Sequence, residues 1–220
     1  MSKTKVLVLY DYFDPAYKAG GPIRSIVNMV KLLEDHLDFY ILATNQDHDG
    51  GFLTVKADDW IVYGKNAHVQ YLSPGKRTYS NLRQIISKLQ PDTVYINGIY
   101  SLLFTVYPLW ILSNNKKCRI IIAPRGMLQK GALAIKATKK RLYLAVLKRL
   151  FSMNQILWHV TNDHEASDLK SELGKPKYTQ LGNIPFYNAE FTIGCSAKTP
   201  AGKIRIHRVD KPDEKYPIWS

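Results

Sequence analysis

Several segments of the sequence combine residue types that could bind a ligand, and the first is Lys18-Ala19-Gly20-Gly21-Pro22. Paired glycines allow the backbone to approach a ligand closely, and a helix N-terminus directly behind them favours an anion. Gly20 and Gly21 are therefore candidates for an anion-binding loop. The segment matches neither the GxGxxG fingerprint of dinucleotide-binding folds nor the Gly-Lys-Ser/Thr sequence of a phosphate-binding loop. A tight turn without a ligand is the alternative.

A second segment, Ala123-Pro124-Arg125-Gly126, directly follows the apolar run RIIIA. An arginine at the carboxyl end of a strand can reach a phosphate or a carboxylate with two parallel N–H donors. Arg125 and Gly126 are thus candidate ligand contacts, and a surface arginine in a turn is the alternative interpretation.

A third segment, Thr161-Asn162-Asp163-His164-Glu165, lies at the last clear strand-to-helix turn. Asn162 or Thr161 can cap the following helix, and a glutamate three residues after Asn162 is typical of a capping box. That structural role accounts for Glu165 as fully as a ligand contact does, so both remain open.

The fourth feature is a one-sided distribution of charge. The chain of 220 residues has a formal net charge of +13, and no acidic residue lies between Asp92 and Asp163. A predicted helix within this interval carries a cluster of basic residues: Lys136, Lys139, Lys140, Arg141, Lys148 and Arg149. Such a helix favours an anionic membrane surface, a phosphorylated ligand or nucleic acid. A solvated basic face, or a core helix with lysines extending to solvent, is the alternative.

Other chemistries lack a starting point in the sequence. The histidines show no metal-ligand spacing, and the two cysteines, Cys118 and Cys195, lie far apart, so we expect no bound metal. A GxSxG nucleophile motif is missing, and we find no zinc-finger, helix-turn-helix or RNP motif. We therefore do not expect nucleic acid as a partner. The longest apolar stretch, residues 99–112, contains Pro108 and is too short to span a bilayer.

These segments sit in an alternation of strands and helices. Strands are expected at 5–10, 39–43, 93–96, 119–123, 156–160 and 178–181, a hairpin or bent strand region at 60–63 and 68–72, and helices at 22–33, 80–89, 100–113, 132–150 and 162–173. Short, continuously apolar strands separated by helices predict an α/β fold, a Rossmann-like doubly wound and mostly parallel sheet. Ligands of such sheets bind beyond the carboxyl ends of the strands, which points to the loops there. We assign 1–185 to this domain and 186–220 to a linker or the truncated start of a second domain.

Five stretches of the chain, in order between about residues 5 and 186, resemble motifs of glycosyltransferase family 4. They are YFDPAYKAGGPIRSIVNMVKLL, PDTVYINGIYS, IIAPRGMLQKGALAIKATKKRLYLAVLKRL, VTNDHEASDL and LGNIPF. The resemblance implies the N-terminal, acceptor-binding half of a GT-B architecture, with two Rossmann-like domains facing a cleft. Gly20 and Gly21 would then lie near the donor diphosphate, and Asn97, Arg125, Gly126 and Glu165 would line the acceptor cleft.

The function that the resemblance implies is retaining sugar transfer from a nucleotide-diphosphate sugar to a glycan or lipid-linked acceptor in surface polysaccharide assembly. The enzyme would need no metal and no cofactor beyond the donor substrate. Asn97 stands where many members have a histidine, which puts an acid or base role at this position in doubt. No E-x7-E motif follows residue 186, so we expect this chain alone to be inactive.

The basic helix would dock on the cytoplasmic leaflet, making the protein cytoplasmic and peripheral on the inner face of the membrane. The alternative function is a non-catalytic Rossmann-like module that binds an anionic polymer or nucleic acid through its basic face.

Overall fold

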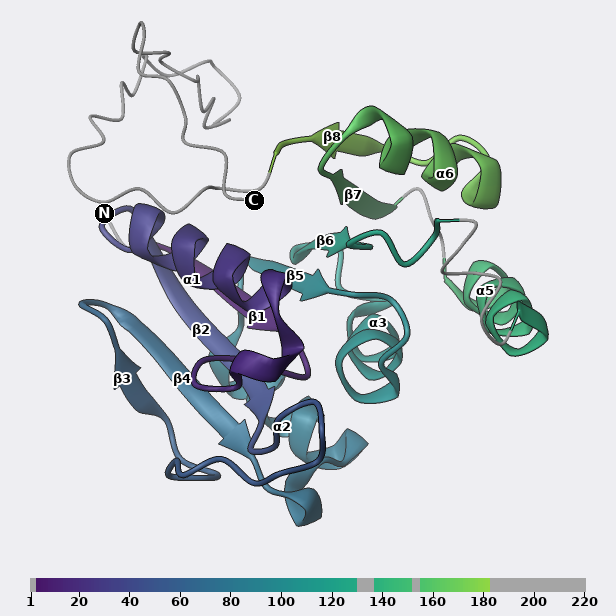
Figure 1. The fold of residues 1–220 in the computed structure, drawn as a ribbon. Helices are drawn as coiled ribbons and strands as arrows, with labels where there is room; N and C mark the ends of the chain where they lie inside the picture. Colours follow the sequence, from purple (N-terminus) through teal and green to yellow (C-terminus); the bar gives the residue numbers. More distant parts are fainter. Residues whose placement is uncertain (1–2, 130–136, 152–154, 183–220) are drawn as a thin grey trace, which may run out of the picture. The chain divides into compact units, whose positions relative to one another are not determined.

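A computed structural model describes residues 3–129, 137–151 and 155–182. Residues 186–220, which the sequence analysis assigns to a linker or second domain, lie outside the described residues, as does Lys136. The described part contains an eight-stranded sheet with the order β3-β4-β2-β1-β5-β6-β7-β8 (Figure 1). Its strands are β1 (Thr4–Leu9), β2 (Leu37–Thr44), β3 (Ile61–Tyr63), β4 (Ala67–Leu72), β5 (Thr93–Asn97), β6 (Arg119–Ala123), β7 (Ile156–Val160) and β8 (Tyr178–Gln180).

The neighbouring strands pair in parallel except at one edge. β3 runs antiparallel to β4, with Val62 opposite His68, and this is the hairpin expected from the sequence. The remaining pairs are parallel: Val8, for example, lies opposite Ile41 of β2 and Tyr95 of β5. The Rossmann-like, doubly wound and mostly parallel sheet expected from the sequence is therefore confirmed.

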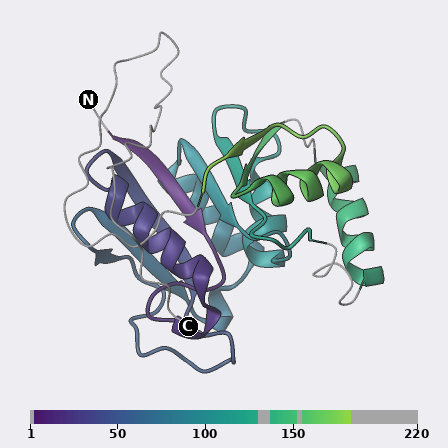
Figure 2. The same ribbon diagram turned by 45° about the horizontal axis from the view of Figure 1, so that its top comes forward.

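Helices cover both faces of this sheet, and Figures 1 and 2 show α1 on one face with α2 and α3 on the other. The helices are α1 (Gly21–Leu33), α2 (Tyr79–Leu89), α3 (Tyr107–Leu112), α5 (Ala137–Leu150) and α6 (Asp163–Leu173). Ile23, Ile26 and Val30 of α1 pack on one side of the central strands. Leucines and isoleucines of α2, α3, α5 and α6 form the core on the other side. Burial of these apolar side chains on both faces stabilises the sheet.

The winding reverses direction between β1 and β5. From β1 the chain moves outward through β2 to β4, and after α2 it returns to β5 and continues through β6 and β7 to β8. Loops after β1 and β5 therefore diverge to opposite faces, which opens a crevice at the carboxyl ends of these two strands.

The helix expected at 100–113 has a different form in the structure. A π-helical turn, η3 (Leu102–Val106), begins after Ser101 and runs into the short α3. Ser101 Oγ accepts a hydrogen bond from Phe104 N at 3.1 Å and so caps this turn. Pro108 in the first turn of α3 has no N–H to donate, which favours irregular pairing of the preceding turn.

Candidate ligand-binding site

A crevice of about 500 Å³ lies at the carboxyl ends of the central strands. It is lined by residues after β1 and β5, by Thr44 at the end of β2, and by single side chains from two further loops: Tyr10, Asp11, Tyr12, Thr44, Arg77, Asn97, Gly98, Ile99, Tyr100, Ser101, Leu102, Leu103 and Met127. Its position is the point of winding reversal, and its volume falls within the range of small-molecule sites.

Asp11 provides the acidic side chain of this crevice. Its Oδ1 accepts a hydrogen bond from Ser101 Oγ at 2.9 Å. Its carbonyl oxygen accepts two hydrogen bonds, from Thr44 N at 3.0 Å and Thr44 Oγ1 at 2.7 Å, which hold the backbone of this loop against β2. Burial raises the pKa of the Asp11 carboxyl above its ordinary value, while Ser101 and Arg77 oppose that rise.

Arg77 supplies positive charge to the same crevice. Its guanidinium donates from Nε to Leu72 O at 3.1 Å, from Nη1 to Gln46 Oε1 at 2.6 Å and from Nη2 to Asn45 Oδ1 at 2.8 Å. Three of its five N–H groups are therefore used to fix its plane. A guanidinium held in this way is oriented before a ligand arrives, so little side-chain entropy is lost on binding.

A chain of hydrogen bonds runs across the sheet into the crevice, and a carbonyl group sets its direction. His159 Nε2 lies 2.9 Å from Leu181 O, which can only accept, so Nε2 carries the proton. Burial lowers the pKa of His159, so the ring is neutral near pH 7 and its Nδ1 accepts from Tyr95 Oη at 2.8 Å. Tyr95 Oη in turn accepts from Arg125 Nη2 at 3.0 Å.

The chain ends at Asn97 with an unused donor. Arg125 Nε donates to Asn97 Oδ1 at 2.7 Å, and because a guanidinium cannot accept, the orientation of the Asn97 amide is fixed. Asn97 Nδ2 is buried and has no hydrogen-bond partner in the part of the chain that the structure describes. The residue is 3% exposed and lines the crevice. A buried N–H without a partner costs free energy, and a ligand acceptor or a water molecule in the crevice would remove that cost.

The residues proposed for an acceptor cleft come together, although not all of them face the crevice. Asn97 lines the crevice, and Arg125 donates a hydrogen bond to the Asn97 side chain. The backbone of Arg125 has a φ of 53°. Gly126 and Glu165 are absent from the lining. Glu165, 2% exposed, accepts from Gly126 N at 2.7 Å, from Thr161 N at 2.7 Å and from Thr161 Oγ1 at 2.8 Å. This carboxylate therefore ties the loop after β6 to the turn after β7.

The capping role of this turn also has a specific form. Asn162 is the N-cap of α6, and its Oδ1 accepts from Glu165 N at 2.9 Å. In a standard capping box the glutamate would return a bond to the cap residue's own N–H. Here the Glu165 carboxylate binds the N–H of Thr161, one residue earlier, and that of Gly126.

Gly20 and Gly21 lie at the N-terminus of α1 and do not line the crevice. Gly20 has φ of 75°, a conformation that L side chains rarely adopt, so the backbone alone accounts for glycine here. Both positions have open space where a Cβ would stand. Among the described residues, the structure shows no contact of Gly20 or Gly21 that supports their assignment to a diphosphate-binding loop.

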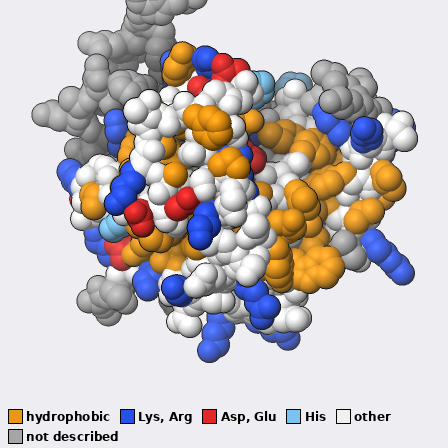
Figure 3. All heavy atoms as spheres, turned by 90° about the horizontal axis from the view of Figure 1, so that it is seen from below, with side chains coloured by type: hydrophobic (Ala, Val, Ile, Leu, Met, Phe, Trp, Pro, Cys, Tyr) orange, Lys and Arg blue, Asp and Glu red, His pale blue; other side chains and the backbone are white. Residues whose placement is uncertain are grey.

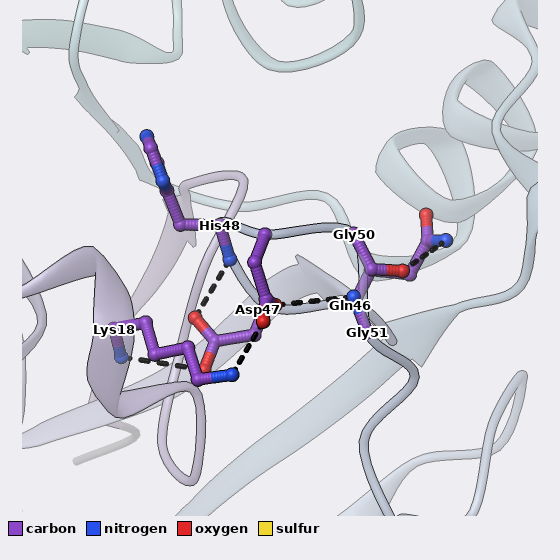
Figure 4. Close-up of polar contacts among 7 residues, drawn as sticks. Lys18, Gln46, Asp47, His48, Gly50 and Gly51 are labelled. Carbon is purple, nitrogen blue, oxygen red and sulfur yellow. Dashed lines mark hydrogen bonds and ion pairs between the residues drawn. The ribbon is translucent and has the colours of Figure 1, made fainter.

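The loops after β1 and β2 are joined to each other (Figure 4). Asp47, which is buried, accepts from Lys18 N at 3.3 Å and from His48 N at 2.7 Å. Lys18 Nζ also forms an ion pair with Asp49. These contacts fix the loop that carries Tyr12 relative to the end of β2, and so shape one wall of the crevice.

The basic residues expected on one helix belong to α5, apart from Lys136. Lys139, Arg141, Lys148 and Arg149 are exposed, whereas Lys140 is half-buried with its Nζ 5.2 Å from the centre of the Tyr100 ring. Lys148 Nζ donates to Glu172 O. Large apolar side chains are also exposed on η3, α3 and α5: Leu102, Trp110, Leu142 and Val146. Figure 3 shows a hydrophobic area on the side of the molecule where α3 and α5 lie.

Several residues of the site were not predicted from the sequence: Asp11, Arg77, Tyr95, Ser101 and His159. Asp11 begins a loop that directly follows a strand, and that signal could have found it, whereas Ser101 falls within the helix expected at 100–113. Tyr95 and His159 lie within strands and Arg77 precedes a helix. Their contacts join positions 30 to 64 residues apart, which spacing along the chain does not reveal.

Within the described ranges, no three His, Cys, Asp or Glu side chains are grouped so that they could hold a metal ion. Of the helices described, none has the length and apolar character needed to cross a bilayer.

No family model and no curated protein matches the chain. Similar folds occur among solved structures at low identity. A dTDP-glucose 4,6-dehydratase of Bacillus anthracis, solved with NAD, has a TM-score of 0.44 at 11% identity, covering 71% of this chain and 53% of that one. A short-chain dehydrogenase/reductase of Veillonella parvula, solved with NADP, has a TM-score of 0.39 at 15% identity, and the match covers 73% of this chain and 70% of that one. The enzyme WbmH of Bordetella bronchiseptica, solved with NAD⁺, has a TM-score of 0.38 at 12% identity, and the match covers 75% of this chain and 60% of that one. This chain thus spans little more than half of the dehydratase.

These findings contradict the resemblance to glycosyltransferase family 4, because the solved structures named above hold NAD or NADP, and two of them are a dehydratase and a short-chain dehydrogenase/reductase. The expected sugar transfer, its nucleotide-sugar donor, its glycan or lipid-linked acceptor, the membrane partner, and the absence of a cofactor are corrected with it. The alternative of a module for an anionic polymer is not supported either.

The resemblance of the five stretches to transferase motifs has a physical explanation. They fall mainly at junctions between strands and helices, where caps, glycines and prolines recur in doubly wound folds of any function. At identities and TM-scores this low, the comparison assigns no reaction to this chain.

Proposed function

We propose that this chain binds a nucleotide in the crevice at the carboxyl ends of β1 and β5. The ribose diol would donate to the Asp11 carboxylate, and a ligand acceptor would take the hydrogen bond of Asn97 Nδ2. The observation that carries the proposal is this buried amide donor, whose direction is fixed by Arg125 and which has no partner among the residues described.

The complement of groups in the crevice supports this class of ligand. A carboxylate can accept from both hydroxyls of a vicinal diol, and Asp11 has one Oδ1 contact, with Ser101. Arg77 provides positive charge for a phosphate, with two N–H groups beyond the three whose acceptors are named above. Tyr12, Tyr100 and Leu102 provide surfaces on which a flat base can lie. A nucleotide ligand also agrees with the cytoplasmic location expected from the sequence.

NAD and NADP are bound in the similarly folded structures, but the residues here do not fit the usual dinucleotide arrangement. In that arrangement a short glycine-rich turn joins the first strand to its helix, and the pyrophosphate lies on the helix N-terminus. Here residues 10–20 separate β1 from α1, and the acidic Asp11 occupies the start of that segment. β2 ends at Thr44, followed by Asn45 and Gln46, whose side chains bind Arg77 instead of a ribose. We therefore derive no hydride-transfer step.

Isothermal titration calorimetry with AMP, GMP, CMP and UMP tests the proposal. At least one of them should bind, and its 2′,3′-dideoxy analogue should bind more than tenfold more weakly, since two hydrogen bonds to a charged carboxylate are lost. Failure of all four nucleotides to bind below about 10 mM, or equal affinity for the dideoxy analogue, would refute it.

Asn97→Asp is the matched variant. The carboxylate that it introduces can still accept from Arg125 Nε, so the support is retained while the donor is removed. The affinity should fall at least fivefold, as expected for one buried hydrogen bond. Asn114→Asp makes the same chemical change at an exposed position outside the crevice, and it should leave the affinity unchanged.

A further inference from the structure

A second cavity, of about 410 Å³, lies between β4 and α2 on the sheet face opposite α1. It is lined by Trp60, Gln70, Asn81, Gln84, Ile85, Lys88 and Leu89, and it shares no residue with the crevice at the strand ends. The two sites can therefore be examined separately.

Gln70 gives this cavity a buried acceptor without a partner. Its Nε2 donates to Asp58 O at 2.7 Å, and because a carbonyl oxygen can only accept, the orientation of the amide is fixed. The opposite atom, Oε1, is buried and has no hydrogen-bond partner within the described ranges. Gln70 is 7% exposed and lines the cavity. A group that donates a hydrogen bond is what this position lacks.

An aromatic wall stands beside this acceptor. Trp60, 37% exposed, meets the Tyr40 ring edge to face at a centroid distance of 5.4 Å. Tyr40 stacks in turn on His68 at 5.2 Å with an interplanar angle of 12°. Ile85 and Leu89 of α2 complete an apolar lining. Rings held by one another in this way present a firm surface to a flat ligand.

The opening of the cavity carries a positive charge. Lys88 lies in the last turn of α2 and is exposed, and no ion pair found among the residues described includes it. A ligand with a negative group directed toward the opening would meet this ammonium.

We propose that this cavity binds an aromatic carboxylate whose ring carries an O–H or N–H donor. The ring lies against Trp60, Ile85 and Leu89, the donor reaches Gln70 Oε1, and the carboxylate faces Lys88. The proposal does not depend on nucleotide binding in the crevice.

The test is an NMR titration of ¹⁵N-labelled protein with 4-hydroxybenzoate, followed at the Gln70 side-chain amide and the Trp60 indole N–H. Benzoate, which lacks the donor, should bind about fivefold more weakly. Phenol, which lacks the carboxylate, should bind about threefold more weakly. Both signals should respond equally when the crevice is saturated with whichever of the four nucleotides binds it, since the two sites share no residue.

Variants assign each contact. Gln70→Met should remove the difference in affinity between 4-hydroxybenzoate and benzoate. Lys88→Met should remove the difference in affinity between 4-hydroxybenzoate and phenol. Lys117→Met, at an exposed lysine elsewhere, should remove neither. If Gln70→Met does not fold, the ligand series with the wild type and Lys88→Met still decides the matter. No shift at Gln70 or Trp60 up to about 10 mM ligand, or equal affinities for the three ligands, would overturn the proposal.

Discussion

Asn97 acquires its chemical direction from groups well outside the crevice. Arg125, which can only donate, gives one hydrogen bond to Asn97 Oδ1 and one to Tyr95 Oη, so the amide of Asn97 keeps Nδ2 as its unused donor. The Asn97 donor is therefore set by Arg125, while His159 and the Leu181 carbonyl hold the Tyr95 hydroxyl that accepts from Arg125 Nη2.

His159 gives the first prediction at this scale, which concerns pH. Burial lowers the pKa of His159 below its ordinary value of 6.5, so the native state favours the neutral ring. Its contribution to stability is present above that ordinary value and is lost as pH falls toward the lowered value. The free energy of unfolding should therefore decline from pH 7 to pH 5. His159→Gln should show a smaller decline in urea titrations at each pH, and an equal decline in both proteins would contradict the assignment.

Asp11 gives a prediction with the opposite sign. Because burial raises the pKa of this carboxyl, the native state holds its proton more tightly than the unfolded chain does. The stability from this group is full below 3.8 and is lost as pH rises through the raised value. Asp11→Asn should therefore raise the free energy of unfolding at pH 7, by on the order of 1 kcal/mol, while weakening nucleotide binding. A variant that is both less stable and equally tight in binding would show that Asp11 has neither role.

At the scale of elements, the loops at the carboxyl ends of the strands are tied to one another by buried acidic groups. Asp47 joins the loop after β2 to the segment before α1, and Glu165 joins the turn after β7 to the loop after β6. Gly126, held by Glu165, directly follows Arg125, so this tie also positions the side chain that orients Asn97. The crevice therefore depends on contacts that do not line it.

Glu165→Ala tests this tie. The substitution leaves the N–H groups of Gly126 and Thr161 and the Thr161 hydroxyl without their acceptor in a partly buried place. We expect a loss of about 3 kcal/mol or more in urea denaturation, since each unpaired buried group costs about 1–3 kcal/mol. Glu172→Ala, on the same helix and less buried, should cost less than about 0.5 kcal/mol. Similar losses in the two variants would contradict the structural role of Glu165.

The elements also show what the sequence can predict. The strands were predictable because short, apolar, β-branched runs between turn residues are typical of buried strands. Their register then follows because both faces of each strand have to pack against helices. The π-helical turn at Leu102–Val106 was not predictable, because it depends jointly on the cap by Ser101, on the missing N–H of Pro108 and on the packing beneath the turn. Of the site, Asn97 and Arg125 were found from their places after strands, whereas Tyr95 and His159 act through pairing across the sheet.

For the molecule as a whole, the reversal of winding between β1 and β5 brings distant segments to one edge of the sheet. Asp11, Arg77, Asn97 and Met127 line the same crevice although they span more than half of the sequence. Short motifs along the chain reflect the local physics of strand-to-helix junctions, which explains how they resembled a transferase family that the comparison of folds contradicts. The chemistry of this protein has to be read from the assembled crevice.

The measurement that tests the central claim most directly is the NMR response of the Asn97 side-chain amide to a nucleotide. Its resonance can be assigned by comparison with Asn97→Asp, and AMP, GMP, CMP and UMP would be titrated in turn. We predict that the tightest binder shifts the Asn97 Nδ2 protons downfield with the same affinity that calorimetry gives, because the free donor gains an acceptor. An unchanged Asn97 amide at saturating nucleotide would contradict the account.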